Sequence, residues 1–263
     1  MEKSLSFKNT KVSYTDFGKG SVVVLLHGFL ENSTMWNAII PEISKTNRVL
    51  SIDLLGHGKT ECLGYVHSME TMADAVFEVL KSLRIRKITL IGHSMGGYVS
   101  LAFAENHPTM IKGLCLMNST SLADEEERKE LRARANKMVQ HNFKNMVQMS
   151  FTNLFSEKSR TKFKPEMELA LAEALKTPVQ GYIACQEGMR IRPNRTHVLS
   201  ENSFKKLIII GKKDPVLTFE EALEEVKKTN SEAIVFEDGH MSHIENKEEL
   251  ASGLINFVKS CKS

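Results

Sequence analysis

The sequence predicts an α/β protein: a mostly parallel β-sheet with helices on both faces. Short runs rich in Val and Ile recur along the 263 residues, as expected of strands buried on both faces. These runs are residues 22–26, 48–53, 87–91, 111–117, 206–210 and 233–236. Amphipathic segments between most of them have apolar residues three or four positions apart, as in helices that pack on a sheet. The alternation is typical of repeated strand–helix–strand units.

Composition indicates an ordinary globular protein. Apolar residues make up 41% of the chain and charged residues 25%, enough for a substantial core. The 35 Lys and Arg against 32 Asp and Glu leave a net charge of +3, which is too small to predict nucleic-acid binding. No apolar run approaches the roughly 20 residues of a membrane span, and the first residues lack a signal peptide's apolar core. We therefore expect a cytoplasmic protein with neither nucleic acid nor membrane as a partner.

The cysteines do not indicate a metal site. Four cysteines are far apart in the chain and form no C-x-x-C pair, namely Cys62, Cys115, Cys185 and Cys261. A zinc site is therefore not predicted, and we expect buried, reduced thiols.

The remaining core elements have simple patterns. Residues 12–17 alternate apolar and polar, which predicts an antiparallel edge strand with one wet face. Helices are predicted at residues 69–83, 98–104 and 247–259, and the first and the last of them have an apolar face. These elements belong to a core made of residues 1–120 and 201–263.

Residues 121–200 break the alternation because they contain no strand-like run. Helices are predicted at about 165–176 and 178–189, with another apolar stripe near 146–154. Ser121-x-x-Asp124 resembles a capping box, and we expect the charged residues that follow it to form a solvated helix face. We interpret this segment as a helical cap or lid over the sheet edge.

The sequence Gly92-His93-Ser94-Met95-Gly96 has the G-x-S-x-G spacing of a nucleophile elbow. It follows one predicted strand and opens a predicted helix, the setting that this sharp turn requires. The pattern therefore predicts Ser94 as a nucleophile. The backbone N–H of Met95, at a helix N-terminus, is predicted to donate to an oxyanion. The alternative is a glycine-rich turn with a solvated serine.

A serine hydroxyl needs a base to take its proton. Among the nine histidines we favour His240, which follows the predicted strand at 233–236 and stands beside Gly239; His243 is the alternative. The acid should lie between serine and base in the chain and should also follow a strand. Asp214 meets both conditions, with helix capping near Phe219 as its alternative role.

The loop after the first buried strand is predicted to supply a second oxyanion donor. It reads His27-Gly28-Phe29-Leu30, and the backbone N–H of Phe29 is the candidate. Three histidines lie in glycine-flanked turns, where we expect them to make hydrogen bonds within the turn: His27, His57 and His93.

With these residues in place, the chain resembles the α/β-hydrolase fold superfamily over essentially its whole length. The motifs are His27-Gly28-Phe29, residues 53–58, Gly92 to Gly97, residues 211–214 and Gly239-His240. The resemblance implies an eight-stranded sheet with a helical cap inserted after the sixth strand. The superfamily's last motif usually has Glu four or five residues after Gly-His, and Glu245 fits this and supports His240 over His243.

The resemblance implies serine hydrolase chemistry with no metal or organic cofactor. Ser94 excludes the dehalogenase and epoxide hydrolase branches, which use aspartate at this position. We expect a carboxylic-ester hydrolase acting through an acyl-enzyme, with Leu30, Phe151 and Phe155 as possible pocket residues or as core. The alternatives are a C–C-bond hydrolase or lyase-like enzyme with the same triad, and a ligand-binding receptor. Three arginines are candidates to bind an acidic substrate, although a solvated surface role is favoured: Arg190, Arg192 and Arg195.

Overall fold

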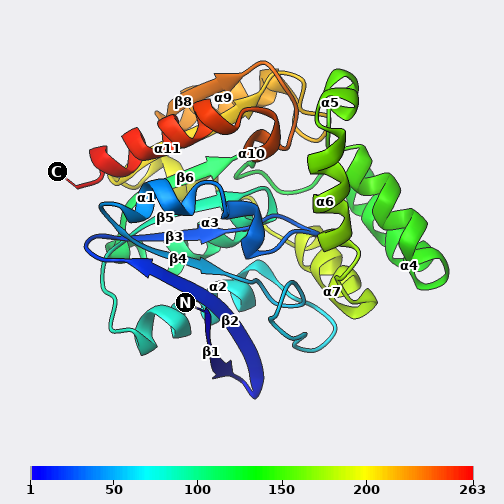
Figure 1. The fold of residues 1–263 in the computed structure, drawn as a ribbon, viewed down its shortest axis with the longest axis horizontal. Helices are drawn as coiled ribbons and strands as arrows, with labels where there is room; N and C mark the ends of the chain where they lie inside the picture. The colour runs from blue at the N-terminus through cyan, green and yellow to red at the C-terminus, as the bar shows by residue number, and fades with distance from the viewer. Residues whose placement is uncertain (1, 263) are drawn as a thin grey trace.

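The computed structural model describes residues 2–262 and contains an eight-stranded sheet with strand order β1-β2-β4-β3-β5-β6-β7-β8 (Figure 1). The strands are β1 (Glu2–Phe7), β2 (Thr10–Gly18), β3 (Val22–Leu26), β4 (Arg48–Ile52), β5 (Ile88–His93), β6 (Ile111–Met117), β7 (Lys205–Gly211) and β8 (Glu232–Phe236). From β4 to β8 all neighbouring strands are parallel, whereas β2 pairs antiparallel with both β1 and β4. The predicted fold class is confirmed.

One strand prediction is wrong in its position. We expected residues 12–17 to form the edge of the sheet, but β2 has a neighbour on each side and β1 is the edge. Residues of β1 alternate too weakly in polarity to identify the strand, because only Phe7 is buried there. The strand pairs through its backbone, which a polarity pattern does not report.

Two apolar layers enclose the sheet because successive strand residues point to opposite faces. On one face, Val24, Leu90 and Leu114 pack with α2 (Met69–Ser82), α3 (Met95–Asn106) and α9 (Phe219–Thr229). On the other face, Val23, Ile91 and Cys115 pack with α1 (Ile40–Ser44) and α11 (Lys247–Ser260). Short helical turns complete the core: η1 (Ser33–Trp36), η2 (Pro108–Met110) and α10 (Ser242–Glu245).

The segment between β6 and β7 contains only helices. They are α4 (Glu126–Thr152), α5 (Glu157–Lys162), α6 (Lys164–Ala174), α7 (Val179–Arg190) and α8 (Thr196–Ser200). Helices α4 to α7 gather at one end of the sheet in Figure 1, and we call them the cap. The cap has its own apolar cluster, in which Val147, Phe151 and Tyr182 are buried with Leu30 and Met241 of the core.

The predicted capping box is wrong. Helix α4 begins at Glu126 after the N-cap residue Glu125, and Ser121 instead donates its backbone N–H to Glu225 at 2.7 Å. The charged residues near it are not all solvated either. Asp124 is buried and pairs with Arg132 of α4 at 2.5 Å and with Arg192 after α7 at 2.8 Å. These ion pairs join two cap helices that are distant in sequence.

The three candidate arginines differ in their surroundings. Only Arg190 is partly solvated, paired with Glu187 of its own helix at 2.8 Å. Arg192 is buried with its guanidinium 3.9 Å from the centroid of the Tyr98 ring. Arg195 is also buried and pairs with Glu70 of α2 and with Glu105 of α3. The solvated-surface interpretation is therefore wrong for Arg192 and Arg195, which connect the segment between α7 and α8 to the core helices.

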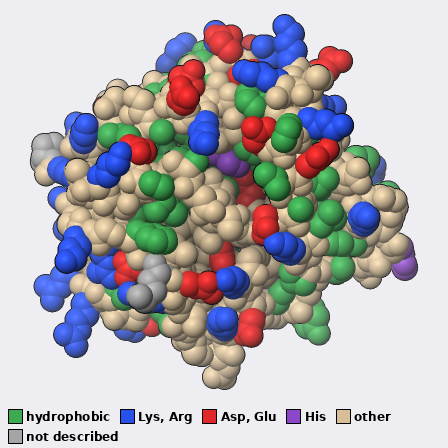
Figure 2. Space-filling model, viewed as in Figure 1, with side chains coloured by type: hydrophobic (Ala, Val, Ile, Leu, Met, Phe, Trp, Pro, Cys, Tyr) green, Lys and Arg blue, Asp and Glu red, His purple; other side chains and the backbone are tan. Residues whose placement is uncertain are grey.

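The surface carries charges of both signs, and the thiols are free. Acidic and basic side chains are mixed over most of the face shown in Figure 2. All four cysteines are free, three of them buried and Cys62 half-buried. Across residues 2–262, none of the helices has both the length and the apolar character needed to traverse a bilayer.

Asp124→Asn tests the buried ion pairs. Burial alone would raise the pKa of Asp124, but the guanidinium groups of Arg132 and Arg192 hold it below its usual value. The variant leaves the buried Arg192 and the partly buried Arg132 without an anion, so we expect the free energy of unfolding at pH 7 to fall by about 3 kcal/mol in urea denaturation. Because the folded-state pKa is lowered, the difference from wild type is present above about pH 4 and shrinks as the pH falls further.

Asp74→Asn is the matched control, since Asp74 is exposed on α2. It should change stability by less than about 0.5 kcal/mol. Equal stability losses in the two variants would contradict a structural role for the Asp124 ion pairs.

Candidate active site

Ser94 lies in a sharp turn between β5 and α3. Its backbone has φ +49° and ψ −114°, and its N–H donates to the carbonyl of Met117 at 2.9 Å. Glycine is required on both sides: a Cβ at Gly92 would collide with the backbone of Gly96, and a Cβ at Gly96 with the carbonyls at the end of β3. The motif therefore forms the strand–turn–helix geometry that holds a serine hydroxyl above a sheet edge.

The structure brings Ser94, His240 and Asp214 together. His240 Nε2 lies 2.9 Å from Ser94 Oγ, and its Nδ1 lies 2.7 Å from Asp214 Oδ2. The histidine is 2% exposed, so water does not compete for these contacts. The arrangement has the geometry of a nucleophile, a base and an orienting acid.

Asp214 faces the histidine instead of capping a helix. Its Oδ1 accepts the backbone N–H groups of Val216 at 2.8 Å and Leu217 at 3.1 Å, while the N-cap of α9 is Thr218. Burial alone would raise the pKa of Asp214, but the charge and hydrogen bond of His240 and the two backbone donors lower it below its usual value. The carboxyl group is therefore held ionised beside the imidazole.

The loop that carries His240 is held by a contact with the cap. The backbone N–H of His240 donates to the carbonyl of Leu154, which follows α4 in the cap, at 3.2 Å. The alternative base, His243, is turned away from Ser94: its Nε2 lies 3.5 Å from Glu31 Oε1. Burial lowers the pKa of His243 to about 4. Of the two histidines, only His240 is hydrogen-bonded to the serine.

Asn118 is a site residue that the sequence analysis missed. It follows β6 with φ +45°, and its side-chain amide donates to Asp214 Oδ2 and to the carbonyl of Gly239, both at 3.2 Å. Its Oδ1 accepts from Ser242 Oγ at 2.6 Å. Asn118 thus joins the loop of the acid to the loop of the base. An asparagine at the end of a buried strand was the only signal in the sequence.

The two predicted oxyanion donors are backbone N–H groups. Within residues 2–262, neither the N–H of Phe29 nor that of Met95 donates to another protein group. The loop of Phe29 is held by two histidines. His27 Nε2 accepts from the N–H of Leu54 at 2.8 Å, and His57 Nε2 accepts from the N–H of Leu30 at 3.1 Å.

These two histidines do more than the predicted bonding within their own turns, because they join separate loops. Burial, the largest effect on each, lowers the pKa of both rings and brings that of His57 to about 3. Neutral rings suit their role as acceptors of backbone N–H groups.

A cavity of about 110 Å³ opens at Ser94. Its lining includes Phe29, Leu30, Ser150, Leu154, Met189 and Val216. Of the three predicted pocket residues, only Leu30 lines this cavity. Phe151 lines a neighbouring hollow of about 720 Å³ that shares Leu30 with it, and Phe155 packs against Phe151 in the cap core, ring centroids 5.8 Å apart.

Arg132 of α4 also lines the cavity, and the sequence analysis treated it as solvated. Its Nε donates to Asp124 Oδ2 at 2.5 Å and its Nη1 to Gln186 Oε1 at 2.7 Å. These bonds fix a guanidinium group at the wall of the Ser94 cavity. None of the three arginines considered from the sequence lines it.

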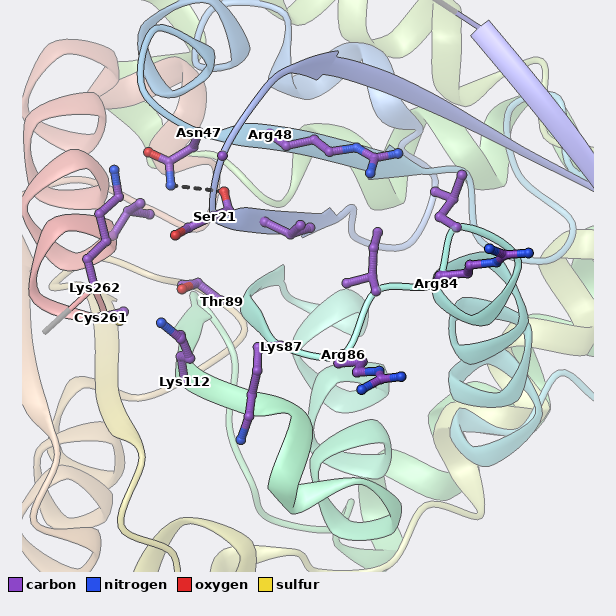
Figure 3. Close-up of a pocket in the computed structure, with 15 residues that line it drawn as sticks. Ser21, Asn47, Arg48, Arg84, Arg86, Lys87, Thr89, Lys112, Cys261 and Lys262 are labelled. Atoms are coloured by element: carbon purple, nitrogen blue, oxygen red, sulfur yellow. Dashed lines mark hydrogen bonds between the residues drawn. The ribbon is translucent and has the colours of Figure 1, made fainter.

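A separate hollow of about 440 Å³ lies at the opposite ends of β3 and β5 (Figure 3). Its charged lining residues are all cationic: Arg48, Arg84, Arg86, Lys87, Lys112 and Lys262. It contains no histidine and no carboxylate, and therefore no pair of nucleophile and base. The candidate active site is the cavity at Ser94.

Comparison with known proteins agrees with the fold. The α/β hydrolase fold family matches residues 21–247, so the chain belongs to this family. A thermophilic esterase from Thermogutta terrifontis, solved with malate bound, has a TM-score of 0.94 at 27% identity over all of both chains. A carboxylesterase structure from Nitrososphaera gargenis has a TM-score of 0.86 at 26% identity over 99% of each chain.

Curated relatives include a hydrolase of another kind. The 2-hydroxy-6-oxo-6-(2'-aminophenyl)hexa-2,4-dienoic acid hydrolase of Metapseudomonas resinovorans is 24% identical over 98% of this chain and 91% of that protein. Uncharacterized proteins of Mycobacterium bovis and Mycobacterium tuberculosis are 33% identical over 39% of this chain. The match spans only 30% of the length of those mycobacterial proteins.

Asn118→Ala tests whether one amide joins the loops of the site. The variant leaves the carbonyl of Gly239 and the hydroxyl of Ser242 without their partner, so we expect the free energy of unfolding to fall by about 1–3 kcal/mol in urea denaturation. Asn202→Ala removes an amide with a single bond to the carbonyl of Val198 and serves as the control. A smaller loss in Asn118→Ala than in Asn202→Ala would contradict this role.

Proposed function

We propose that this protein is a serine hydrolase that cleaves carboxylic esters or related acyl compounds. The observation that carries the proposal is the hydrogen-bonded chain from Ser94 through His240 to Asp214. An esterase fold relative at 27% identity over the whole chain supports the same substrate class. The substrate would be a small molecule, and the free, mostly buried thiols support a cytoplasmic location.

In the proposed reaction, Ser94 Oγ attacks the carbonyl carbon of the ester while His240 Nε2 takes its proton. The negative charge of Asp214 stabilises the imidazolium and keeps Nδ1 protonated. His240 then returns the proton to the departing alcohol, which leaves an acyl group on Ser94. Water activated by His240 hydrolyses this acyl-enzyme and restores the serine.

The backbone N–H groups of Phe29 and Met95 would stabilise the oxyanion of each tetrahedral intermediate. Neither N–H has an acceptor among residues 2–262, and Met95 is the first residue of α3, where helix N–H groups lack intrahelical partners. Donors fixed before the reaction need no reorganisation when the charge develops.

A second candidate function is hydrolysis of a C–C bond in an acidic substrate. It is favoured by Arg132, which places a guanidinium group at the cavity wall, and by the full-length match to a dienoic acid hydrolase. A guanidinium binds a carboxylate through charge-assisted hydrogen bonds. The same triad would serve, since the reaction also breaks a bond next to a carbonyl group.

Ser94→Ala tests the nucleophile. We expect loss of p-nitrophenyl acetate hydrolysis by about 10⁴-fold or more, and loss of covalent labelling by a fluorophosphonate, because no other group attacks the carbonyl. Ser150→Ala removes a hydroxyl from the same cavity and should retain both activities. Labelling of folded Ser94→Ala protein, or its absence from wild type, would refute the proposal.

The cavity volume predicts a preference for short acyl groups. Wild type should hydrolyse p-nitrophenyl acetate with a higher kcat/KM than the octanoate, because 110 Å³ does not accommodate an eight-carbon chain. Leu154→Ala enlarges the cavity and should move the optimum towards longer chains, measured as kcat/KM across a series of chain lengths. An optimum at long chains in wild type would show that the cavity does not hold the acyl group.

Arg132→Leu separates the two candidate functions. If the substrate is an uncharged ester, turnover should be unchanged; if it carries a carboxylate, kcat/KM should fall by about 10- to 100-fold through loss of a charged hydrogen bond. The measurement compares p-nitrophenyl acetate with a 2-hydroxy-6-oxo-dienoate substrate. Arg134→Leu, on the exposed face of the same helix, is the control.

A further inference from the structure

Two buried ionisable groups beside Ser94 are not part of the proposed triad. His93 directly precedes Ser94, and Glu31 lies two residues after Phe29. Both line the cavity, yet His93 is only 1% exposed and Glu31 7%. Neither was predicted as a site residue. For His93 we expected only hydrogen bonding within its own turn.

Both ring nitrogens of His93 face hydrogen-bond acceptors. Nδ1 lies 2.6 Å from Glu31 Oε2, and Nε2 lies 3.0 Å from the backbone carbonyl oxygen of His240. A carbonyl oxygen cannot donate, so Nε2 must carry a proton. A neutral imidazole carries only one N–H. The proton between His93 and Glu31 therefore decides whether the pair is charged.

The surroundings place that proton on His93. Glu31 Oε2 also accepts the backbone N–H of Gly28 at 2.7 Å, which favours the carboxylate. Burial alone would raise the pKa of Glu31, but the charge of His93 and its hydrogen bond lower it to about 2. Burial alone would lower the pKa of His93, and Glu31 raises it above its usual value. The hydrogen bond from Gly28 and the two opposite pKa shifts all favour a carboxylate paired with an imidazolium.

This ion pair connects two backbone segments that must both be held beside Ser94 in the proposed reaction: the loop of Phe29 and the loop of His240. Through Glu31 it holds the N–H of Gly28, the residue before the proposed oxyanion donor Phe29. Through His93 it holds the carbonyl of His240, the proposed base. His93 itself is covalently joined to the nucleophile. One pair of side chains thus contacts the proposed oxyanion loop and the proposed base, and is joined to the proposed nucleophile.

We propose that Glu31 and His93 are positioning residues, whose ion pair holds the oxyanion loop and the backbone of His240 in place around Ser94. This inference rests on the proposed function of the Ser94 site. If the imidazolium of His93 loses a proton to solvent, one ring nitrogen becomes an acceptor that faces another acceptor. Either the bond to Glu31 or the bond to the carbonyl of His240 is then lost, and His93 no longer joins the two loops.

The neighbourhood of His93 contains few other ionisable groups. They come from the loop after β3, from the loop after β7 and from the segment after β8: His27, Glu31, Asp214, His240 and His243. The ring of His243 packs edge-on against His93 with centroids 5.5 Å apart. Its lowered pKa keeps it neutral, so it does not replace His93 as the partner cation of Glu31.

A metal ion does not account for this cluster. Glu31, His93 and His243 are the one group of potential ligands in residues 2–262 whose atoms lie within 4.8 Å of one another. However, Glu31 Oε2 and His93 Nδ1 are 2.6 Å apart, in direct hydrogen-bond contact. Two ligand atoms that each bind one tetrahedral ion at about 2 Å would lie more than about 3 Å from each other. The contact is an ion pair.

Glu31→Gln is the decisive variant, because Gln keeps the shape but removes the charge that holds the proton on His93. With p-nitrophenyl acetate, we expect kcat to fall by up to about 100-fold, while KM changes little. The activity requires the imidazolium, which is present below the raised pKa of His93. Removing the anion lowers that pKa, so the alkaline limb of the kcat profile should move to lower pH by about 1–3 units.

His93→Gln should show the same fall in kcat without the shifted limb, because its amide does not titrate. His243→Gln is the control: it removes another buried imidazole beside Glu31 without touching the carbonyl of His240, and its profile should match wild type. An unchanged alkaline limb in Glu31→Gln would overturn the proposal, as would equal losses of kcat in Glu31→Gln and His243→Gln.

If the variants do not fold, ¹⁵N NMR of wild-type protein with ¹⁵N-labelled histidine measures the protonation of the His93 ring directly. His93 should show two protonated nitrogens at pH 7, and a neutral ring would overturn the proposal. This measurement needs no substrate. A wild type that hydrolyses no ester but contains an imidazolium at His93 would refute the proposed function and leave the ion pair intact, so the two failures are distinguishable.

Discussion

The close approach of α3 to the end of β3 is the contact on which the site depends. At Gly96 the helix backbone lies so near the carbonyls of Leu26 and His27 that a side chain would collide with them. Beside this contact Ser94 adopts a backbone with positive φ, and within residues 2–262 the N–H of Met95 at the start of the helix has no protein acceptor. The strain is tolerated because the sheet on one side and α3 on the other are both buried in the largest apolar cluster.

Around this rigid turn, the other groups come from loops that are held by buried polar contacts as well as by apolar packing. Asn118 joins the loops of Asp214 and His240, and the histidines His27 and His57 hold the loop of Phe29. The Glu31–His93 pair then connects the Phe29 loop to the His240 loop. Each of these side chains is buried, so a lost partner costs more than in water. The active-site edge of the sheet is therefore both polar and ordered.

Sequence patterns are most informative where a residue's role depends on its immediate neighbours. The elbow at Ser94, the strands that precede Asp214 and His240, and the cap between β6 and β7 all have local signals, and the structure has them in the expected places. Roles that depend on distant partners could not be predicted. Asp124 lies in a run of charged residues that predicts a solvated face, and only its contact with the distant Arg192 explains its burial. Glu31 has no local feature that distinguishes it from an exposed loop carboxylate, because its partner His93 is 62 residues away. The pattern of polar and apolar residues predicts which side chains are buried, but it does not predict which charged residues form ion pairs.

The bond from the N–H of His240 to the carbonyl of Leu154 gives the cap a direct hold on the proposed base. Leu154 lies just after α4, so a displacement of this part of the cap would break a contact of His240. The position of the proposed base therefore depends on a segment more than 80 residues away in the chain as well as on its own loop after β8.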